Sequence, residues 1–338
     1  MRVTGALTRR QGALLALFPV LAALAALCIG RMWLSPGDVL KALGGKLGLV
    51  SDVPAQTSTV VWSIRMPRIL MALLVGAGLS ASGCAFQGLF ANPLATPDTL
   101  GVASGASFGA ALALLMGMSL MGVQALALIM GITAVMLTYI AGRGRGERSV
   151  NTVVLAGIMI GSLFTALVSL VKFVADTESQ LPAITYWLMG SLNSASYDTL
   201  LLGAPPVLLG CVLLLMLRWR LNLLPLPEDE ARASGVNIAL LRGVTVICAT
   251  MMTASCVSMC GQVGWVGLLV PHICRMKFGN NNLSLMPASV CIGAGFMVLV
   301  DTFARSATAA EIPISILTAI IGAPFFIMLM RKSGGWKL

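Results

Sequence analysis

The feature that most constrains this chain is a series of ten apolar runs separated by turn-forming or charged residues. A bilayer-crossing helix needs about 20 apolar residues, so ten helices use roughly 200 positions. That share agrees with the apolar content of 58%, and the charged content of 10% excludes an ordinary water-soluble enzyme. The pattern predicts an all-α, polytopic membrane protein with a single transmembrane domain over residues 1–338. The runs cover approximately residues 12–33, 66–90, 100–120, 122–141, 152–174, 199–217, 240–260, 263–275, 284–304 and 313–331.

The first run follows Arg9 and Arg10, as the apolar core of a signal peptide would. It lacks a small-residue cleavage site and is longer than such a core, so we interpret it as the first membrane helix.

The distribution of basic residues predicts the orientation, because cytoplasmic loops carry an excess of Lys and Arg. With both termini inside, fifteen basic residues fall on the inner side and seven on the outer side. This asymmetry accounts for the net charge of +10 without a nucleic-acid partner. The outer set is Arg31, Lys41, Lys46, Arg65, Arg68, Lys172 and Arg305.

Three loops are unusual. The outer segment 34–62 is long and polar enough to lie along the surface. Residues 175–198 contain an apolar stretch around Trp187 that is too short to span, which predicts a helix at or re-entering the interface. The inner segment 218–242 is strongly charged, and its Glu228 and Asp229 are favourable at a helix start.

Groups for chemistry are scarce. The chain has one histidine, His272, with no His or Cys partner at metal spacing, and we expect a packed side chain rather than a ligand. There is no G-x-x-x-x-G-K-[ST] phosphate loop. The eight cysteines lie in apolar runs without a C-x-x-C pair, which argues against a disulfide or zinc framework. Asp301 and Glu311, near the outer ends of the last two runs, are the only candidates for intramembrane carboxylates.

Small residues and prolines mark the places where helices come close or break. Gly101, Gly105 and Gly109 recur at every fourth position, a spacing that lets helix backbones approach closely. Helix-breaking residues predict breaks at or within membrane depth, where the freed backbone groups need partners or a water-lined cavity. They lie at residues 92–93, 96–97, 264–271 and 322–324. A solute pathway and a kinked but sealed bundle both fit this pattern.

Six separated motifs, in the same order, resemble the FecCD/BtuC family of permeases for iron complexes, haem and cobalamin. The resemblance covers nearly the whole chain. The motifs are RMPR (65–68) with the following LLVGAGLSASGCAFQGLFANPLATPDTLGVASGASFG, LAGIMIG (155–161), YWLMGSL (186–192), EDEARASGVN (228–237), GWVGLLVPHICR (264–275) and EIPISILTAIIGAPFF (311–326).

The resemblance implies a BtuC-like, type II ABC importer permease in the cytoplasmic membrane. It implies a second permease copy, identical or paralogous, two cytoplasmic ATPase subunits and a periplasmic or lipoprotein binding protein. The permease would hold no cofactor and catalyse nothing itself, since ATP and Mg would bind to the ATPase partner. The expected solute is an iron(III) chelate of the siderophore type, with haem and cobalamin as alternatives.

The resemblance also assigns roles to residues at both ends of the helices. On the outer face Arg65, Arg68 and Arg305 match positions that meet acidic residues of the binding protein. A planar guanidinium suits carboxylates, although arginines also anchor helix ends, and Arg68 is the one we expect to support the fold. On the inner face the segment at about 225–240 matches the coupling helices that contact the ATPase; a solvated loop is the alternative. The coupling residues are Glu228, Asp229, Glu230, Arg232 and Gly235.

The inner gate of the family falls, by counting back from Leu155, on Val150 and Asn151, where the family has a small hydroxylated pair. The chain departs from the pattern there. Ser162, Thr165 and Ser169 could give the pathway a polar face. A secondary carrier driven by an ion gradient is the alternative class, disfavoured by the scarcity of buried carboxylates, and a passive channel has no positive support.

Overall fold

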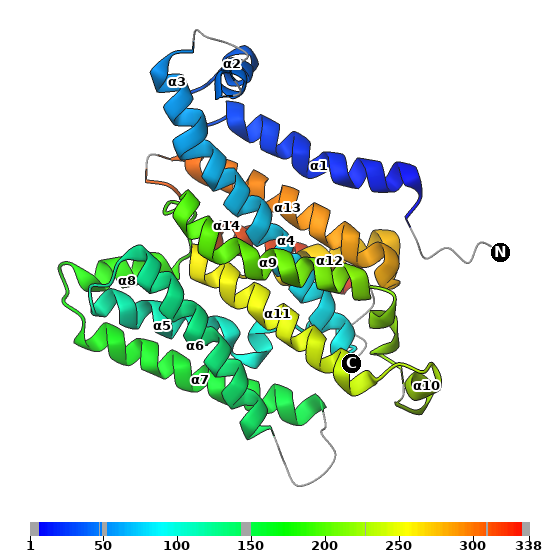
Figure 1. Ribbon diagram of the computed structural model, residues 1–338. Helices are drawn as coiled ribbons and strands as arrows, with labels where there is room; N and C mark the ends of the chain where they lie inside the picture. The colour runs from blue at the N-terminus through cyan, green and yellow to red at the C-terminus, as the bar shows by residue number, and fades with distance from the viewer. Residues whose placement is uncertain are drawn as a thin grey trace.

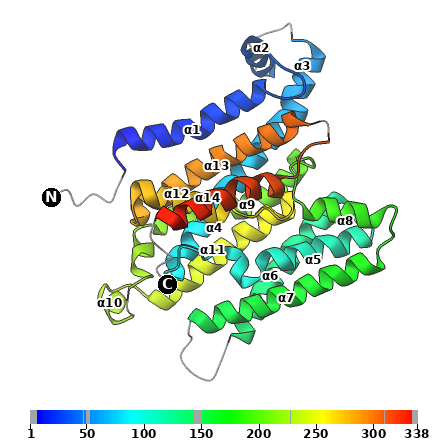
Figure 2. The same cartoon turned by 180° about the vertical axis from the view of Figure 1, so that it is seen from behind.

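The computed structural model describes residues 7–46, 48, 53–142, 150–226, 228–308 and 310–332. Over these residues the chain forms helices and no β-strand, and the long helices pack into one bundle (Figures 1 and 2). Seven helices in this part of the chain are long and apolar enough to cross a membrane. These are α1 (Arg9–Cys28), the continuous helix Ala55–Leu89 that ends as α4 (Met66–Leu89), α6 (Leu120–Ala141), α7 (Val150–Val174), α9 (Tyr197–Leu217), α11 (Ile238–Cys260) and α13 (Asn282–Ala307).

Three further predicted runs form α5 (Val102–Leu115), α12 (Val266–Phe278) and α14 (Ile314–Lys332), whose apolar portions are shorter. All ten predicted runs therefore contain a helix, and the predicted fold class is confirmed. Backbone breaks shorten α5 and α12, because Gly101 and Trp265 precede them with φ of 78° and 69°.

The centre of the bundle is formed by α4 and α11, which pack against each other and against α9. In each, 78% of the most apolar window is buried, compared with 17% in α1 and α7. Glycines permit this packing: a Cβ on Gly76 would lie 2.1 Å from the carbonyl oxygen of Gly293 in α13, and one on Gly83 would lie 1.8 Å from that of Gly267 in α12. The close approach predicted for Gly105 and Gly109 is confirmed in α5, where an added Cβ would lie 2.6 and 2.4 Å from carbonyl oxygens of α6.

The helix that becomes α4 starts earlier than the sequence predicts. Within the outer segment 34–62 the chain forms α2 (Pro36–Lys46) and α3 (Ala55–Thr59), and then continues through a π-helical turn, η1 (Val60–Arg65), into α4 without a break. Pro67, which follows, has no N–H to donate to the preceding turn. A π turn changes the register of the hydrogen bonds there, so the helix continues.

The prolines behave differently from one another. Residues 91–96 separate α4 from the 3₁₀ turn η2 (Pro97–Leu100), as predicted for Pro93 and Pro97. The helix break predicted for the segment from Gly264 to Pro271 lies at residues 261–265, where Gly261 and Trp265 both have positive φ. Pro271 itself lies inside α12, and the break predicted at Gly322–Pro324 is wrong, because Pro324 lies inside α14.

Short helices mark the two ends of the bundle (Figure 1). Following the predicted orientation, we call one end of the bundle the outer end. It carries α2, α3, α8 (Gln180–Leu188) and the turn from α13 to α14. The inner end carries the start of α1, the end of α14, α10 (Glu228–Ala233) and the 3₁₀ turn η3 (Arg220–Leu223). The helix predicted within residues 175–198 corresponds to α8.

Candidate functional site

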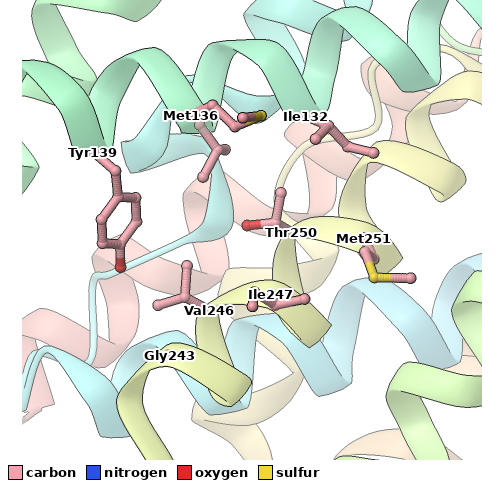
Figure 3. A pocket seen from close by; sticks show the side chains of 9 residues that line it. Ile132, Met136, Tyr139, Gly243, Val246, Ile247, Thr250 and Met251 are labelled. Carbon is pink, nitrogen blue, oxygen red and sulfur yellow. The ribbon is translucent and has the colours of Figure 1, made fainter. Parts of the chain in front are cut away.

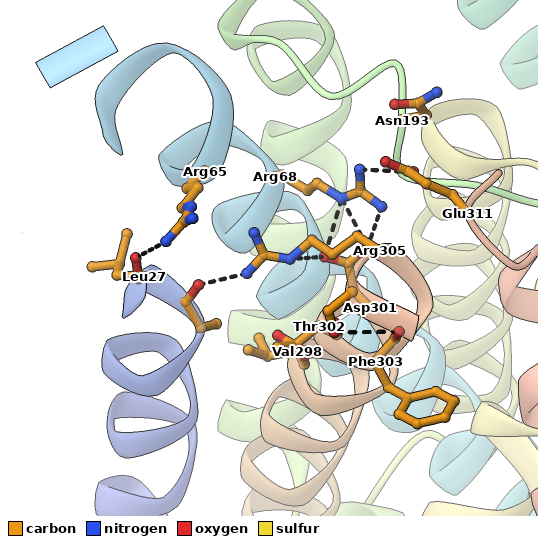
Figure 4. Close-up of polar contacts among 12 residues, drawn as sticks. Leu27, Arg65, Arg68, Asn193, Val298, Asp301, Thr302, Phe303, Arg305 and Glu311 are labelled. Carbon is orange, nitrogen blue, oxygen red and sulfur yellow. Dashed lines mark hydrogen bonds and ion pairs between the residues drawn. The ribbon is translucent and has the colours of Figure 1, made fainter. Parts of the chain in front are cut away.

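Buried charges gather at the outer end, where α4, α13 and the turn before α14 meet (Figure 4). The Nε of Arg68 donates to both carboxylate oxygens of Asp301, at 2.9 and 3.1 Å, and its Nη1 lies 3.0 Å from Oε2 of Glu311. Arg68 and Asp301 are only 7% and 1% exposed. Because Arg68 and Asp301 carry opposite charges and are in contact, this buried pair meets the requirement for keeping ions out of water.

Arg65 and Arg305 are buried beside this pair and point to the end of α1. Arg65 donates to the backbone carbonyls of Leu27 and Met32, and Arg305 donates to that of Ala26. The last carbonyls of a helix have no partner within the helix and favour cations. Arg305 also lies 3.8 Å from Asp301, so the two guanidiniums tie α1 to α4 and α13. We call Arg65, Arg68, Asp301, Arg305 and Glu311 the outer ion cluster.

Glu311 connects this cluster to the turn before α14. Its φ is 52°, a backbone conformation that residues other than glycine rarely adopt. Arg31, whose side chain is 56% exposed, lies 3.7 Å from the other carboxylate oxygen of Glu311. The strained residue is therefore held by Arg68 on its buried side and by Arg31 on its exposed side.

The sequence predicts Arg65, Arg68 and Arg305 as contacts of a binding protein, and the structure buries all three at 3%, 7% and 7% exposure. The described contacts give Arg68 the fold-supporting role that we expected for it. They leave direct docking through the three arginines as a prediction. The sequence indicates Asp301 and Glu311 only as candidate intramembrane carboxylates. The signal that could have paired them with the arginines is their predicted depth, because all of these residues are expected near the outer ends of the helices.

Below the cluster, three chain segments join through backbone hydrogen bonds. Ser191 donates to the carbonyl of Cys260 at 2.8 Å, and Ile314 donates to that of Gly190 at 3.0 Å. Gly190 and Gly261 allow this approach, since both have positive φ and a Cβ on Gly261 would lie 2.2 Å from a carbonyl oxygen. The end of α8, the break after α11 and the start of α14 thus satisfy one another, as irregular backbone in a membrane must.

The predicted pathway residues line one side of α7. Ser162, Thr165 and Ser169 are all exposed and share a helix face, and each donates its hydroxyl to the carbonyl four residues earlier, at 2.8 to 3.1 Å. Their remaining lone pairs face outward as weak acceptors. Large apolar side chains make up most of the remaining uncovered surface of α7, with Phe173 86% and Met159 63% exposed.

The other predicted residues at the inner end are only partly described. Val150 and Asn151 begin α7, but their side chains, like those of Glu228, Asp229 and Arg232, lie outside the described residues. In and after α10, Glu230 and Gly235 are exposed, while Ala231 is 1% exposed and fixes the short helix to the bundle. Gly235 has a φ of 74°, which reverses the chain before α11.

A cavity of about 280 Å³ opens between α6 and α11 (Figure 3). Its lining is apolar apart from the hydroxyl groups of Tyr139 and Thr250, so it offers no charged group to an anionic solute. Elsewhere in the described part of the chain, no three His, Cys, Asp or Glu side chains are grouped so as to hold a metal ion. His272 packs edge-on to Phe326, with ring centroids 5.6 Å apart.

Comparisons with known proteins cover almost the whole chain. The FecCD transport family matches residues 17–332. The molybdate import system permease protein MolB of Haemophilus influenzae is 44% identical over 318 residues, 94% of each chain. A probable iron chelatin transport system permease protein of Helicobacter pylori is 38% identical over 279 residues, 82% of this chain and 84% of that protein. The solved structure of an inward-facing, putative metal-chelate type ABC transporter is 42% identical, with a TM-score of 0.86 over 96% of this chain and 100% of that one.

Proposed function

The chain belongs to the FecCD transport family, and on that premise we propose that it carries an iron(III) chelate through the membrane by alternating access. The family and the apolar helices make it a multi-pass membrane protein and the permease of an ABC importer. ATP, with Mg, would bind to a separate ATPase partner. The observation that carries the proposal is the match of both sequence and fold over 96% of the chain to a transporter described as metal-chelate type.

Molybdate is a second candidate for the solute, because the permease that is 44% identical is described as a molybdate import protein. Haem and cobalamin are the further alternatives from the sequence. The hydroxyl groups of Ser162, Thr165 and Ser169 support a weakly binding pathway for a complex recognised elsewhere, since none of them carries charge. Selectivity would then lie mainly in the binding protein.

Uptake into proteoliposomes tests the solute. The permease is reconstituted with its genomic ATPase and binding protein, and uptake of radiolabelled iron–siderophore complexes, molybdate and cobalamin is compared. We expect ATP-dependent uptake of an iron chelate. Uptake of molybdate alone would move the assignment to an oxyanion, and uptake driven by a proton or sodium gradient without ATP would move the chain to the secondary carriers.

We propose that a second permease copy, identical or paralogous, covers α7 and α14. Both helices leave large apolar side chains uncovered, including Phe173 at 86% and Ile320 at 64% exposure. In a bilayer such faces contact lipid or protein, and the exposed hydroxyls of α7 favour a shared, water-accessible pathway. Cysteine cross-linking between copies at Ser169 would support this interface, and its failure beside efficient cross-linking at another α-helix would contradict it.

The coupling role rests on α10. It projects from the inner end (Figure 1), and of its described side chains Glu230 and Ala233 are exposed and Ala231 is buried, so it can enter a partner's groove without disturbing the bundle. We expect Glu230→Lys to weaken capture of the ATPase about tenfold, the effect of about 1.4 kcal/mol. The matched control is Glu178→Lys at the outer end, which is equally exposed and should leave capture unchanged.

Binding-protein docking is proposed for the outer end. Arg65, Arg68 and Arg305 are buried, so their substitution tests docking only beside a measurement of stability. Arg305→Lys keeps the charge and loses the planar fork. Salt-sensitive loss of binding-protein capture at an unchanged melting temperature would support direct contact, whereas loss of capture in step with the melting temperature would assign these arginines to the fold alone.

A further inference from the structure

Two grooves flank α1 on opposite sides, and they differ in charge. One groove, of about 480 Å³, runs between α1, α4, α9 and α13, and every residue that lines it is apolar. The other, of about 440 Å³, lies at the inner end between α1, α12 and α13. It is lined by Gln11, Leu14, Leu15, Phe18, Lys277, Phe278 and Ile292, and we call it the Lys277 groove.

The Lys277 groove has a polar mouth and an apolar floor. Gln11 lies in the first turn of α1 and Lys277 in the last turn of α12, so both are at the level where the helices leave the membrane. Phe18 lies two turns deeper, about 10 Å along α1 at 1.5 Å per residue. There the ring packs directly on α13, since a Cβ on Gly295 would lie 2.3 Å from it. The depth and chemistry match a lipid with its headgroup at the mouth.

Charge at the mouth is positive and unpaired. The Nζ of Lys277 lies 5.9 Å from the ring centroid of Phe278, which keeps the exposed ammonium beside the groove. Among the described ion pairs none includes Lys277. Arg10 is also exposed and precedes Leu14 by one turn of α1, so helix spacing places a second cation near this mouth.

We propose that the Lys277 groove binds an anionic diacyl phospholipid, with the phosphate headgroup against Lys277 and Arg10 and one acyl chain along Leu14, Leu15 and Phe18. Basic pockets between membrane helices hold anionic headgroups, and apolar surface at this depth is covered by acyl chains. Figure 2 shows the start of α1 on the side of the bundle where α12 and α13 meet, and residues of these three helices line the groove. The site is separate from the outer ion cluster and from α10.

Native mass spectrometry of the full-length permease in detergent tests the site, with phosphatidylglycerol and phosphatidylcholine as paired probes. We expect the wild type to bind phosphatidylglycerol more tightly. Lys277→Gln should reduce that preference about fivefold, since each basic residue near the surface contributes about 1 kcal/mol. Arg10→Gln should act in the same direction. Ile292→Trp should fill the groove and weaken both lipids.

Two matched controls separate this site from general attraction of lipid to a basic protein. Lys172→Gln removes a cation from the last turn of α7 at the outer end. Leu208→Trp fills the other groove beside α1, which is lined only by apolar residues. Both should leave the preference for phosphatidylglycerol unchanged. An unchanged preference in Lys277→Gln, or an equal loss in Lys172→Gln, would overturn the proposal. The proposal would also be overturned if the assembled complex bound no lipid in the groove because a chain terminus or the ATPase occupied it.

Discussion

The two ends of the bundle use their charges in opposite ways. At the outer end, Arg65, Arg68, Asp301 and Arg305 are at most 7% exposed and bond to one another or to backbone carbonyls. At the inner end, Glu230 and Lys277 are exposed. The buried charges of the outer ion cluster therefore hold helices together, whereas Glu230 and Lys277 remain available to partners.

This difference indicates where each end can change without loss of the fold. Removing one member of a buried ion pair leaves the other uncompensated, while an exposed charge is already hydrated and its removal costs little. The buried members of the outer ion cluster should consequently be intolerant of substitution for reasons of stability. Substitution of the exposed charges at the inner end should change stability little but should affect function.

The largest expected effect is at Asp301. Asp301→Asn should lower the free energy of unfolding by about 3–5 kcal/mol, because the buried Arg68 would keep Glu311 alone as its counter-ion and the buried Arg305 would lose its carboxylate partner. Arg68→Met should act similarly. Thermal unfolding in detergent measures the effect. The matched control is Arg31→Gln, an exposed cation 3.7 Å from Glu311, which should cost at most about 1 kcal/mol. Equal losses in Asp301→Asn and Arg31→Gln would remove the distinction between buried and exposed charges.

At the inner end the largest effect should come from backbone conformation instead of charge. Gly235→Ala should lower stability by about 1–2 kcal/mol, because a side chain is strained at its φ of 74° although no atom lies within 4 Å of the added Cβ. The control Gly243→Ala separates the effect of backbone conformation from the effect of the space around the added Cβ. Gly243 is helical and also has open space around it, so alanine there should raise stability by up to about 1 kcal/mol. Similar changes at both positions would contradict the role of the positive φ.

A smaller effect is expected for the exposed charge of α10. Glu230→Gln should change the free energy of unfolding by no more than about 0.5 kcal/mol, as surface substitutions do. The stimulation of the partner's ATP hydrolysis by the permease, measured in the reconstituted complex, should nevertheless fall. A stability loss comparable with that of Asp301→Asn would show that α10 belongs to the fold instead of presenting charges to a partner.

The fold was largely predictable because membrane helices are encoded locally. An apolar run such as 240–260 must satisfy its own backbone as a helix, whatever its neighbours are. The structure gives α11 (Ile238–Cys260) there. The breaks were less predictable. Pro271 and Pro324 lie inside helices, and the break between α11 and α12 lies at residues 261–265, next to Cys260, whose carbonyl accepts a hydrogen bond from Ser191.

The outer site was predictable in its residue types but not in its pairings. Arg68 and Asp301 are 233 positions apart, and no local pattern states which face of each helix turns inward. The three arginines were placed on the outer side, and that placement said nothing of their burial. At the inner end the side chains of Val150 and Asn151 lie outside the described residues, so the gate remains a prediction from the resemblance.

The smallest effect should come from Asp176, an exposed carboxylate at the outer end before α8. The side-chain hydroxyl of Ser179, at 2.7 Å, and then the backbone N–H groups of Ser179 and Glu178 donate to it and lower the pKa of Asp176 below its usual range. A lowered pKa means that folding favours the ionised form. The stabilisation is therefore fully present above the unfolded pKa of about 3.9 and is lost as the pH falls through the folded value. Asp176→Asn should melt slightly below the wild type at pH 7, and this difference should shrink when the pH is lowered below about 4. A difference that grows on acidification would contradict the sign. A loss at pH 7 as large as that of Asp301→Asn would mean that position at the outer end, and not burial, determines the effect of a carboxylate.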